Sequence, residues 1–351
     1  GVNMEYDLTT SIKKISVDDK GKVALLQGHG EPTVQEVAQL AQQLAVLYDV
    51  EAYTISDADE IPAYFKAVVI INPTDTIPLA HFTKIDNYMT QGGSVFLSHS
   101  NLNGDLSTGQ LSVGNDIGIR GWLSRKKVNM GNQFVIDSNS GTVTVQQQNG
   151  MFNFRSQIKF PYFPRINNFT DHPTTKGLED IMLPFVSALT YSGTDSLVSF
   201  TPLLLTSEAS GFAATPGAVN INKKWSQNDF NQGEQVVALA LDGPLGGSVD
   251  SRLVVISNGS YVINGNPPQQ ISEDNVNFTS NAIDWLSDDT GLIDLRTKGI
   301  SVRPLEAVED STREMLKYGN VLGPILLILI YAFVRRQRNQ MKRNKWREGV
   351  Y

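Results

Sequence analysis

Apolar and polar residues follow one another in distinct blocks over the first hundred residues of the chain. Val23–Gln27 is a short, mainly apolar run, Gly28–Pro32 interrupts it, and Thr33–Leu47 repeats apolar residues at helical spacing. This order predicts a strand, a turn and a helix, with Thr33 as the residue that caps the helix.

The same alternation continues to residue 98. The pattern predicts three further strands and one helix, which are Val50–Ile55, Ala67–Ile71, Val95–Ser98 and the helix His81–Thr90, ended by Gly92-Gly93. The run Ala67–Ile71 is continuously apolar, as a strand buried on both faces should be. Strands that alternate with helices indicate α/β architecture with a doubly wound, mostly parallel sheet.

The helical rhythm stops beyond Gly104. Residues from about 111 to 235 contain many turn residues and alternating stretches such as Gln133–Asp137 and Thr142–Gln146, so we interpret this range as a β-rich insertion. The sheet is then expected to resume, with strands at Gln235–Leu241 and Arg252–Ile256 and a helix near Asn275–Leu286.

Near its end the chain has an uncharged apolar run, Val321–Val334, followed at once by Arg335-Arg336. The segment Tyr318–Val334 would be about 26 Å long as a helix, slightly short of the hydrocarbon core of a bilayer, which is about 30 Å thick. Because the run is apolar on every side, it predicts a transmembrane helix and not one lying in the membrane surface. The alternative is a buried C-terminal helix of a soluble domain.

Charge predicts the orientation of this helix. Seven basic residues and one glutamate give residues 335–351 a charge of +6, which leaves −13 for residues 1–334 out of the net −7. The positive-inside bias places the basic flank in the cytoplasm. We therefore expect an inner-membrane protein with a periplasmic main domain, and the acidic outer part argues against nucleic-acid binding.

Composition adds two expectations. The chain contains no cysteine, which excludes disulfides, thiolate metal sites and cysteine nucleophiles. It opens with Gly1-Val2 and has neither an initiator methionine nor a signal peptide. We therefore expect that an N-terminal region carrying another membrane segment precedes it.

These observations predict six parts of the chain. They are the end of a preceding region (1–20), an extracytoplasmic α/β domain (21–290), its insertion (about 111–235), a linker (291–317), the transmembrane helix (318–334) and a basic cytoplasmic tail (335–351).

Several fragments occur in the order and spacing of a known family. They are Lys22–Glu31, Gly92–Leu97, Pro161–Pro164, His172-Pro173 with Gly177-Leu178, Pro202–Ser207, and Asn281–Leu286 with Arg296 and Lys298. From about residue 20 to the C-terminal helix, the chain resembles the auxiliary subunit of gliding-motility-type ABC transporters, the GldG family.

The resemblance implies a protein held by membrane helices at both ends, with a periplasmic domain of the glutamine-amidotransferase-like type. It also implies two partners, an ABC permease and a separate ATPase. Members of the family are often labelled substrate-binding, although their substrate is generally unidentified. Amidotransferases use a cysteine after a central strand. The comparable turn here is Ser98-His99-Ser100, so that activity is not transferred to this chain.

Polar residues directly follow four predicted strands: His29, Asn72, His99 and Asn258. In a doubly wound sheet these positions meet at the carboxyl edge, so they could form one ligand-binding cleft with Glu31 at its rim. Three other interpretations stay open. They are ordinary loop residues, a metal site of two histidines and a carboxylate, and an anion cradle or simple tight turn at Gly28–Glu31.

Other chemistry receives less support. The chain lacks the P-loop motif, so its energy must come from a partner. Ser98 and Ser100 beside His99 suggest a membrane-anchored hydrolase, but G-x-S-x-G is absent. His172-Pro173 is interpreted as a capping turn. Pro161–Pro164 is interpreted as core filling under a loop, with an exposed partner surface as the alternative.

We therefore predict a non-catalytic auxiliary subunit of an ABC transporter complex, linked to gliding motility or secretion, that needs no cofactor or metal. It would bind a partner or an unidentified ligand. Gly319 and Gly323 lie four residues apart on one face of the membrane helix and are the predicted contacts with the permease.

Overall fold

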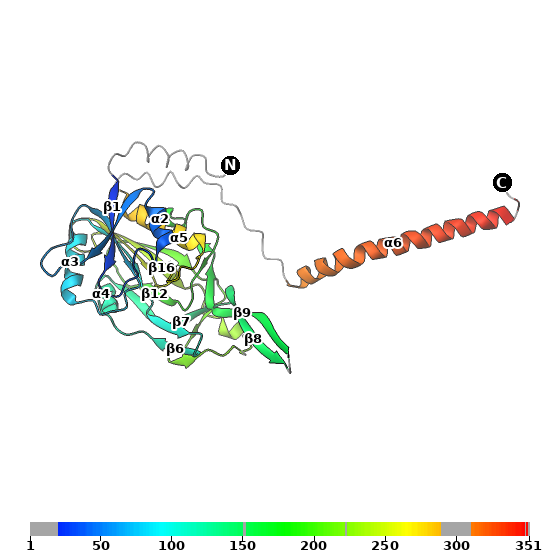
Figure 1. Ribbon diagram of the computed structural model, residues 1–351, viewed down its shortest axis with the longest axis horizontal. Helices are drawn as coiled ribbons and strands as arrows, with labels where there is room; N and C mark the ends of the chain where they lie inside the picture. The colour runs from blue at the N-terminus through cyan, green and yellow to red at the C-terminus, as the bar shows by residue number, and fades with distance from the viewer. Residues whose placement is uncertain (1–19, 150–151, 222, 289–309, 348, 350–351) are drawn as a thin grey trace. The chain divides into compact units, whose positions relative to one another are not determined.

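The structure is a computed structural model that describes residues 20–149, 152–221, 223–288, 310–347 and 349 (Figure 1). The chain divides into two units, residues 1–302 and residues 303–351. The predicted N-terminal region, except Lys20, and most of the predicted linker lie outside the described residues. Each unit is considered by itself.

An eight-stranded sheet is the centre of the first unit, in the order β10-β13-β16-β17-β4-β3-β1-β2. The strands are β1 (Gly21–Gln27), β2 (Tyr48–Thr54), β3 (Phe65–Ile71), β4 (Ser94–Ser98), β10 (Asn168–Phe169), β13 (Ser199–Leu205), β16 (Val236–Gly243) and β17 (Ser251–Ile256). The five strands from β17 to β2 pair in parallel. The other three extend the sheet by antiparallel pairing.

Helices cover both faces of the parallel strands (Figure 1). They are α2 (Ala38–Leu44), α3 (Leu79–Thr90), α4 (Ile119–Arg125) and α5 (Glu273–Leu286). Successive side chains of a strand point to opposite faces. Val23 and Leu25 therefore belong to the core with α2 and α5, whereas Ala24 and Leu26 belong to the core with α3 and α4.

The predicted α/β architecture is thus confirmed as a mixed fold with a large, partly parallel sheet. The doubly wound arrangement describes the five parallel strands. It does not describe β16, β13 and β10, because these run in alternating directions.

The predicted strands and helices of the sheet all occur, with shifted ends, but Thr33 does not cap a helix. Residues 34–37 form turns, and α2 begins at Ala38 after Val37. The Glu36 carboxylate accepts hydrogen bonds from Thr33 N and Oγ1, and the Glu36 carbonyl accepts one from Asn264 N at 2.7 Å. The same carbonyl also accepts from Gly265 N at 3.2 Å, so both of its lone pairs bond the segment before α5 and neither is left for another helical turn.

The range 111–235 is rich in strands, as predicted. Three three-stranded sheets include residues of this range: β5-β6-β15, β12-β7-β14 and β8-β9-β11. Their strands are β5 (Leu102–Asp105), β6 (Gln110–Val113), β7 (Val128–Asp137), β8 (Ser140–Asn149), β9 (Phe152–Ile166), β11 (Ile181–Met182), β12 (Ser187–Tyr191), β14 (Ser210–Ala213) and β15 (Gly217–Ala218). The range also supplies β10 and β13 to the central sheet, because Leu203 and Leu204 fill its core.

The second unit contains one helix, α6 (Asp310–Arg347), among its described residues. It is longer than the predicted 318–334 at both ends. The segment Met315–Asn344 is long and apolar enough to cross a membrane, with a mean hydropathy of 1.6, and none of its most apolar stretch is buried. Pro324 lies inside the helix.

Candidate functional site

The predicted site residues lie at the carboxyl edge of the parallel strands. The chain leaves β1 towards β2 on one side and leaves β3 towards β4 on the other, so β1 and β3 border the switch point of the sheet. His29 and Glu31 follow β1, Asn72 follows β3, His99 follows β4, and Asn258 follows β17. This edge is therefore the place where a ligand would be expected.

The Glu31 carboxylate closes the turn after β1 through two contacts with His29. One oxygen of Glu31 accepts a hydrogen bond from His29 N at 2.6 Å, and the other lies 3.1 Å from His29 Nδ1. Gly28 and Gly30 have φ of 110° and 77°, and a Cβ on Gly30 would lie 2.0 Å from Thr74 Oγ1. The glycines are needed for this tight turn. Because Glu31 occupies the His29 N–H, that N–H is not available to cradle an anion.

A line of four side chains runs outward from this turn. His29 Nε2 lies 2.8 Å from Nδ1 of His81, in the first turn of α3, and His81 Nε2 lies 3.1 Å from Oδ1 of Asp57. The side chains of Glu31 and His29 are only 1% and 4% exposed, whereas that of Asp57 is 94% exposed. We call Glu31, His29, His81 and Asp57 the relay.

The number of hydrogens that the relay needs follows from its donors and acceptors. Each of its three side-chain links needs one hydrogen, and ionised carboxylates at the two ends can only accept. Two neutral imidazoles carry two such hydrogens. With both carboxylates ionised, the three links are therefore complete when the imidazole pair holds one additional proton.

Sequence reasoning missed two members of the relay. His81 was assigned only to a helix, and Asp57 was not assigned to any site. The available signal was topological, because the helix after β3 begins at the same sheet edge at which β1 ends. Asp57 lies in the loop after the edge strand β2, and no sequence pattern indicates its contact with His81.

The turn after β4 contains no paired serine and histidine. Ser98 Oγ donates to the Gly259 carbonyl at 3.5 Å, and Ser100 Oγ accepts from Gly259 N at 2.8 Å. His99 Nδ1 is buried and has no hydrogen-bond partner. The geometry that a serine hydrolase needs is therefore absent from this turn.

Burial, with a smaller contribution from Arg120, lowers the pKa of His99 to about 4, and Asp116 opposes this shift. His99 is therefore a neutral imidazole at physiological pH. Its unpaired nitrogen is a buried polar atom that could bind a ligand group, and an atom left in this state lowers stability.

Asn72 and Asn258 form hydrogen bonds with backbone atoms of the neighbouring loops. Asn72 has φ of 43° and donates its N–H to the Ser98 carbonyl at 2.8 Å. The Asn258 side chain donates to the Pro184 carbonyl and accepts from Ser260 N. A Cβ on Gly259 would lie 1.9 Å from Asn72 Oδ1, so the loops after β3 and β17 are tightly interlocked.

The predicted residues thus share one edge but form two groups, the relay and the interlocked loops after β3, β4 and β17. In the described part of the chain, no group of three or more histidine, cysteine, aspartate or glutamate side chains could hold a metal ion. The geometry therefore gives no support to a facial triad of His29, His99 and Glu31.

Two weaker sequence signals are structural. His172 precedes the 3-10 helix η1 (Pro173–Thr175), its Nδ1 accepts from Thr174 N, and its ring packs against Trp285, as expected for a capping turn. The Pro161–Pro164 segment contributes to a buried aromatic cluster, as predicted. That cluster contains Phe134, Phe160, Tyr162, Phe163, Phe185 and Trp225.

The match to a known family extends over almost the whole first unit. Residues 20–288 match the family described as "ABC-type uncharacterized transport system". The chain belongs to this family. It is therefore an auxiliary component of an ABC-type transport system, a kind of system that also contains a permease and an ATPase.

This auxiliary component is also similar to solved structures at low identity. It is 13% identical to the structure titled "mmIFT52 N-terminal domain", with a TM-score of 0.48 over 76% of this chain and 97% of that one. It is 10% identical to PurLQS from Thermotoga maritima, with a TM-score of 0.35 over 76% of this chain and all of that one. No curated protein matches it.

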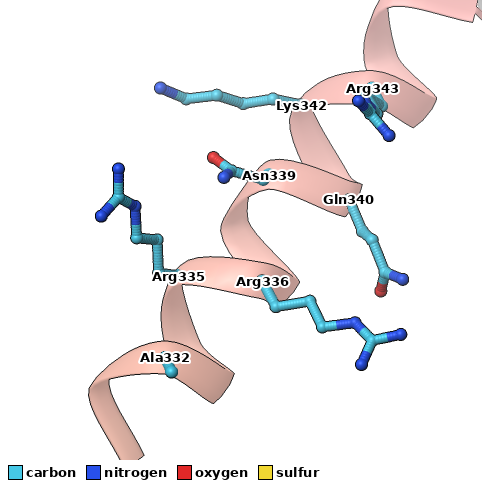
Figure 2. A pocket seen from close by; sticks show the side chains of 7 residues that line it. All are labelled: Ala332, Arg335, Arg336, Asn339, Gln340, Lys342 and Arg343. Carbon is cyan, nitrogen blue, oxygen red and sulfur yellow. The ribbon is translucent and has the colours of Figure 1, made fainter. Parts of the chain in front are cut away.

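The auxiliary component has a second candidate surface on α6. Figure 2 shows Arg335 and Lys342 on one flank of the helix, Arg336, Gln340 and Arg343 on the other, and Asn339 between them. These side chains, together with Ala332, line a shallow groove formed by one helix alone. A Cβ on Gly319 or Gly323, one turn apart on α6, would meet open space.

Proposed function

We propose that this chain is a non-catalytic auxiliary subunit that α6 anchors in the inner membrane beside an ABC permease and a separate ATPase. The observation that carries the proposal is the combination of the family match over residues 20–288 with a helix whose apolar side chains are exposed. One helix cannot form a transport path. The protein therefore acts on transport through partners.

The orientation of the proposed anchor follows from its flanking charges. Arg335, Arg336 and Arg338 immediately follow the apolar segment. The positive-inside bias places them in the cytoplasm and the α/β domain in the periplasm. The periplasmic domain would then have an amidotransferase-like fold that lacks the cysteine nucleophile.

The carboxyl edge is the proposed ligand- or partner-binding region of the domain. It contains His29, Glu31, Asn72, His99 and Asn258. The solvent-exposed end of the relay supports this role, because the Asp57 carboxylate can still form a hydrogen bond to another molecule. Most of the other polar atoms on this edge hold the loops together.

Gly319 and Gly323 are the proposed contact with the permease. Close approach of two helices in lipid favours small residues, and these two glycines lie one turn apart on one side of α6. The resemblance to the gliding-motility type extends the proposal to the physiological process. We expect the complete transporter to support gliding or secretion.

The test replaces both glycines with leucine in the full-length protein. Added bulk should separate the helices, so the amount of permease that co-purifies in detergent should fall at least several-fold. Gliding or secretion should fall with it in cells that lack their own copy. The melting temperature of the first unit should stay unchanged, because neither residue belongs to its core.

The matched control adds bulk on the opposite side of the same helix. Val321→Phe with Ile325→Phe enlarges two positions that are also four residues apart but are rotated by about 200° from the glycines. This variant should recover the permease normally. Equal recovery with the glycine variant and with wild type would show that the contact lies elsewhere.

A further inference from the structure

The C-terminal end of α6 carries a concentrated positive charge, and the acidic residues of this helix, Asp310 and Glu314, lie more than twenty residues before it. We call Arg335, Arg336, Arg338, Lys342 and Arg343 the basic extension. From Met315 to Arg347 the sequence contains no aspartate or glutamate. The five side chains are exposed, and no intrahelical ion pair at i±3 or i±4 can neutralise them.

The helix continues without a break from the apolar segment into this extension. At a rise of about 1.5 Å per residue, Arg335 to Arg338 lie within about 6 Å of Val334 along the axis, and Lys342 and Arg343 lie about 12 to 14 Å away. The headgroup layer on each side of a bilayer is about 5 to 7 Å thick. The first three cations are therefore level with lipid phosphates whenever the apolar segment spans the membrane.

Side-chain direction brings the remaining two cations towards the same layer. In an α-helix every Cα–Cβ bond tilts towards the N-terminus, which in α6 is the direction of the apolar segment. Lys342 and Arg343 therefore lean back along the helix. This direction favours lipid headgroups over a protein surface that would have to approach from beyond the end of the helix.

The five cations of the basic extension occupy one side of the helix. At about 100° per residue the five cations span an arc of about 160°, and the opposite side carries Gln337, Gln340, Met341 and Asn344. Figure 2 shows the cationic side, with Asn339 between the flank of Arg335 and Lys342 and the flank of Arg336 and Arg343. The uncharged side leaves room for a neighbouring protein helix.

We propose that the basic extension binds the phosphate headgroups of anionic phospholipids and collects these lipids around α6. The proposal rests on the membrane anchoring in the proposed function. Guanidinium groups form two parallel hydrogen bonds with a phosphate, and each cation near an anionic surface strengthens attraction by a factor of about five. Charge complementarity and the adjoining apolar segment place this ligand directly beside the cations.

The test measures which lipid surrounds the extension. Because the chain has no cysteine, Asn339→Cys provides a single labelling position among the cations. The full-length labelled protein is reconstituted into phosphatidylcholine vesicles containing a small fraction of acceptor-labelled phosphatidylglycerol or acceptor-labelled phosphatidylcholine. Energy transfer to phosphatidylglycerol should exceed transfer to phosphatidylcholine several-fold, and this preference should weaken as salt is added.

Charge-changing variants test whether the cations cause the preference for phosphatidylglycerol. Lys342→Gln with Arg343→Gln should lower it several-fold and leave only the part that the three proximal arginines provide, whereas Lys342→Arg with Arg343→Lys should keep it. Gln337→Ala with Asn344→Ala changes the uncharged side and should have no effect. The three proximal arginines are left intact so that the orientation of the helix does not change. Inorganic phosphate should reduce the preference no more than chloride does at equal ionic strength.

The outcomes separate this proposal from the one on which it rests. Loss of the protein from pure phosphatidylcholine vesicles after an alkaline wash would contradict the anchoring itself. Firm retention with equal transfer to both lipids would overturn lipid binding. A preference displaced by inorganic phosphate beyond the effect of salt would identify a free-anion site and overturn the lipid assignment. Equal lipid transfer with charge-dependent capture of the ATPase subunit would identify a protein surface.

Discussion

The strands of the α/β domain and the helix α6 use the same apolar residues in opposite surroundings. Val254 and Val255, in β17, are fully buried, whereas the side chains of Leu327 and Ile328, in α6, have residue exposures of 69% and 67%. Burial of apolar area is a main source of folding free energy. The domain obtains this free energy by burying apolar side chains in its own core. The apolar side chains of α6 can be buried only by a lipid bilayer or a partner protein.

The difference follows from how each region pairs its backbone. Parallel strands bond to their neighbours, so a strand is completed only inside a sheet, and both faces of that sheet are then covered by helices. A helix satisfies its own backbone and leaves its side chains available. Similar composition can therefore specify a protein core in one region and a candidate membrane segment in the other.

The largest expected effect comes from placing the same charge in both regions. Val255→Asp should bury an unpaired carboxylate in the sheet and destabilise the domain by on the order of 4 kcal/mol or more, so cooperative melting of the full-length protein should be lost. Leu329→Asp should leave that melting unchanged. It should instead make the free energy of membrane insertion less favourable by about 3 kcal/mol, measured as a smaller amount of the protein in the membrane pellet.

The exposed Val249, in the loop before β17, provides the control. Val249→Asp should change neither melting nor retention, because its carboxylate remains in water. If Leu329→Asp destabilised the domain, or if Val255→Asp melted like wild type, the contrast between the two regions would be wrong.

A smaller effect is expected from pH, and it should be confined to the domain. Burial lowers the pKa of His99 to about 4 from its ordinary value of 6.5. Between pH 6.5 and pH 4 the unfolded state therefore binds more protons at this residue than the folded state does. Its contribution to stability is present above pH 6.5 and falls by about 3 kcal/mol as the pH is lowered to 4.

The measurement compares the free energy of unfolding of wild type and His99→Gln across this pH range in detergent. Glutamine does not titrate, so the variant should show the shallower pH dependence. Retention in neutral vesicles should show no difference between the two proteins. Identical pH slopes would mean that His99 is accessible to protons in the folded state.

The smallest expected effect concerns the relay. His81→Ala removes the partner of the buried His29 Nε2 and should cost about 1 to 3 kcal/mol, measured as a lower free energy of unfolding. Asp57→Asn changes only the exposed end and should cost less than about 0.5 kcal/mol. If both substitutions lowered the free energy of unfolding equally, the buried members of the relay would not contribute more stability than the exposed end.

Periodicity identified the regular elements because each is dictated by neighbouring residues. The continuous apolar run of β3 and the helical spacing of α5 are local patterns, and both elements occur where they were predicted. Thr33 was assigned wrongly because the competing interaction comes from Asn264, more than two hundred residues later. A local pattern contains no information about such a partner.

The candidate site shows the same limit. The strand ends predicted which residues would share an edge, since all parallel strands end on one side of their sheet. They did not predict that Glu31 would close on His29, or that His81 and Asp57 would extend this pair to solvent. The family match and the apolar C-terminal helix, in contrast, need no contact to be recognised.

The amino-acid sequence by itself therefore determined the alternation of strands and helices, the candidate membrane segment and the family of this protein. Hydrophobic periodicity, segment length and order of motifs are properties of the covalent chain. Only the tertiary structure decided that β13 joins the central sheet, that His99 Nδ1 is buried without a hydrogen-bond partner, and that side chains from three separate segments form the relay. Each of these depends on distances between residues far apart in the chain, which exist only once the sheet and its helices have packed.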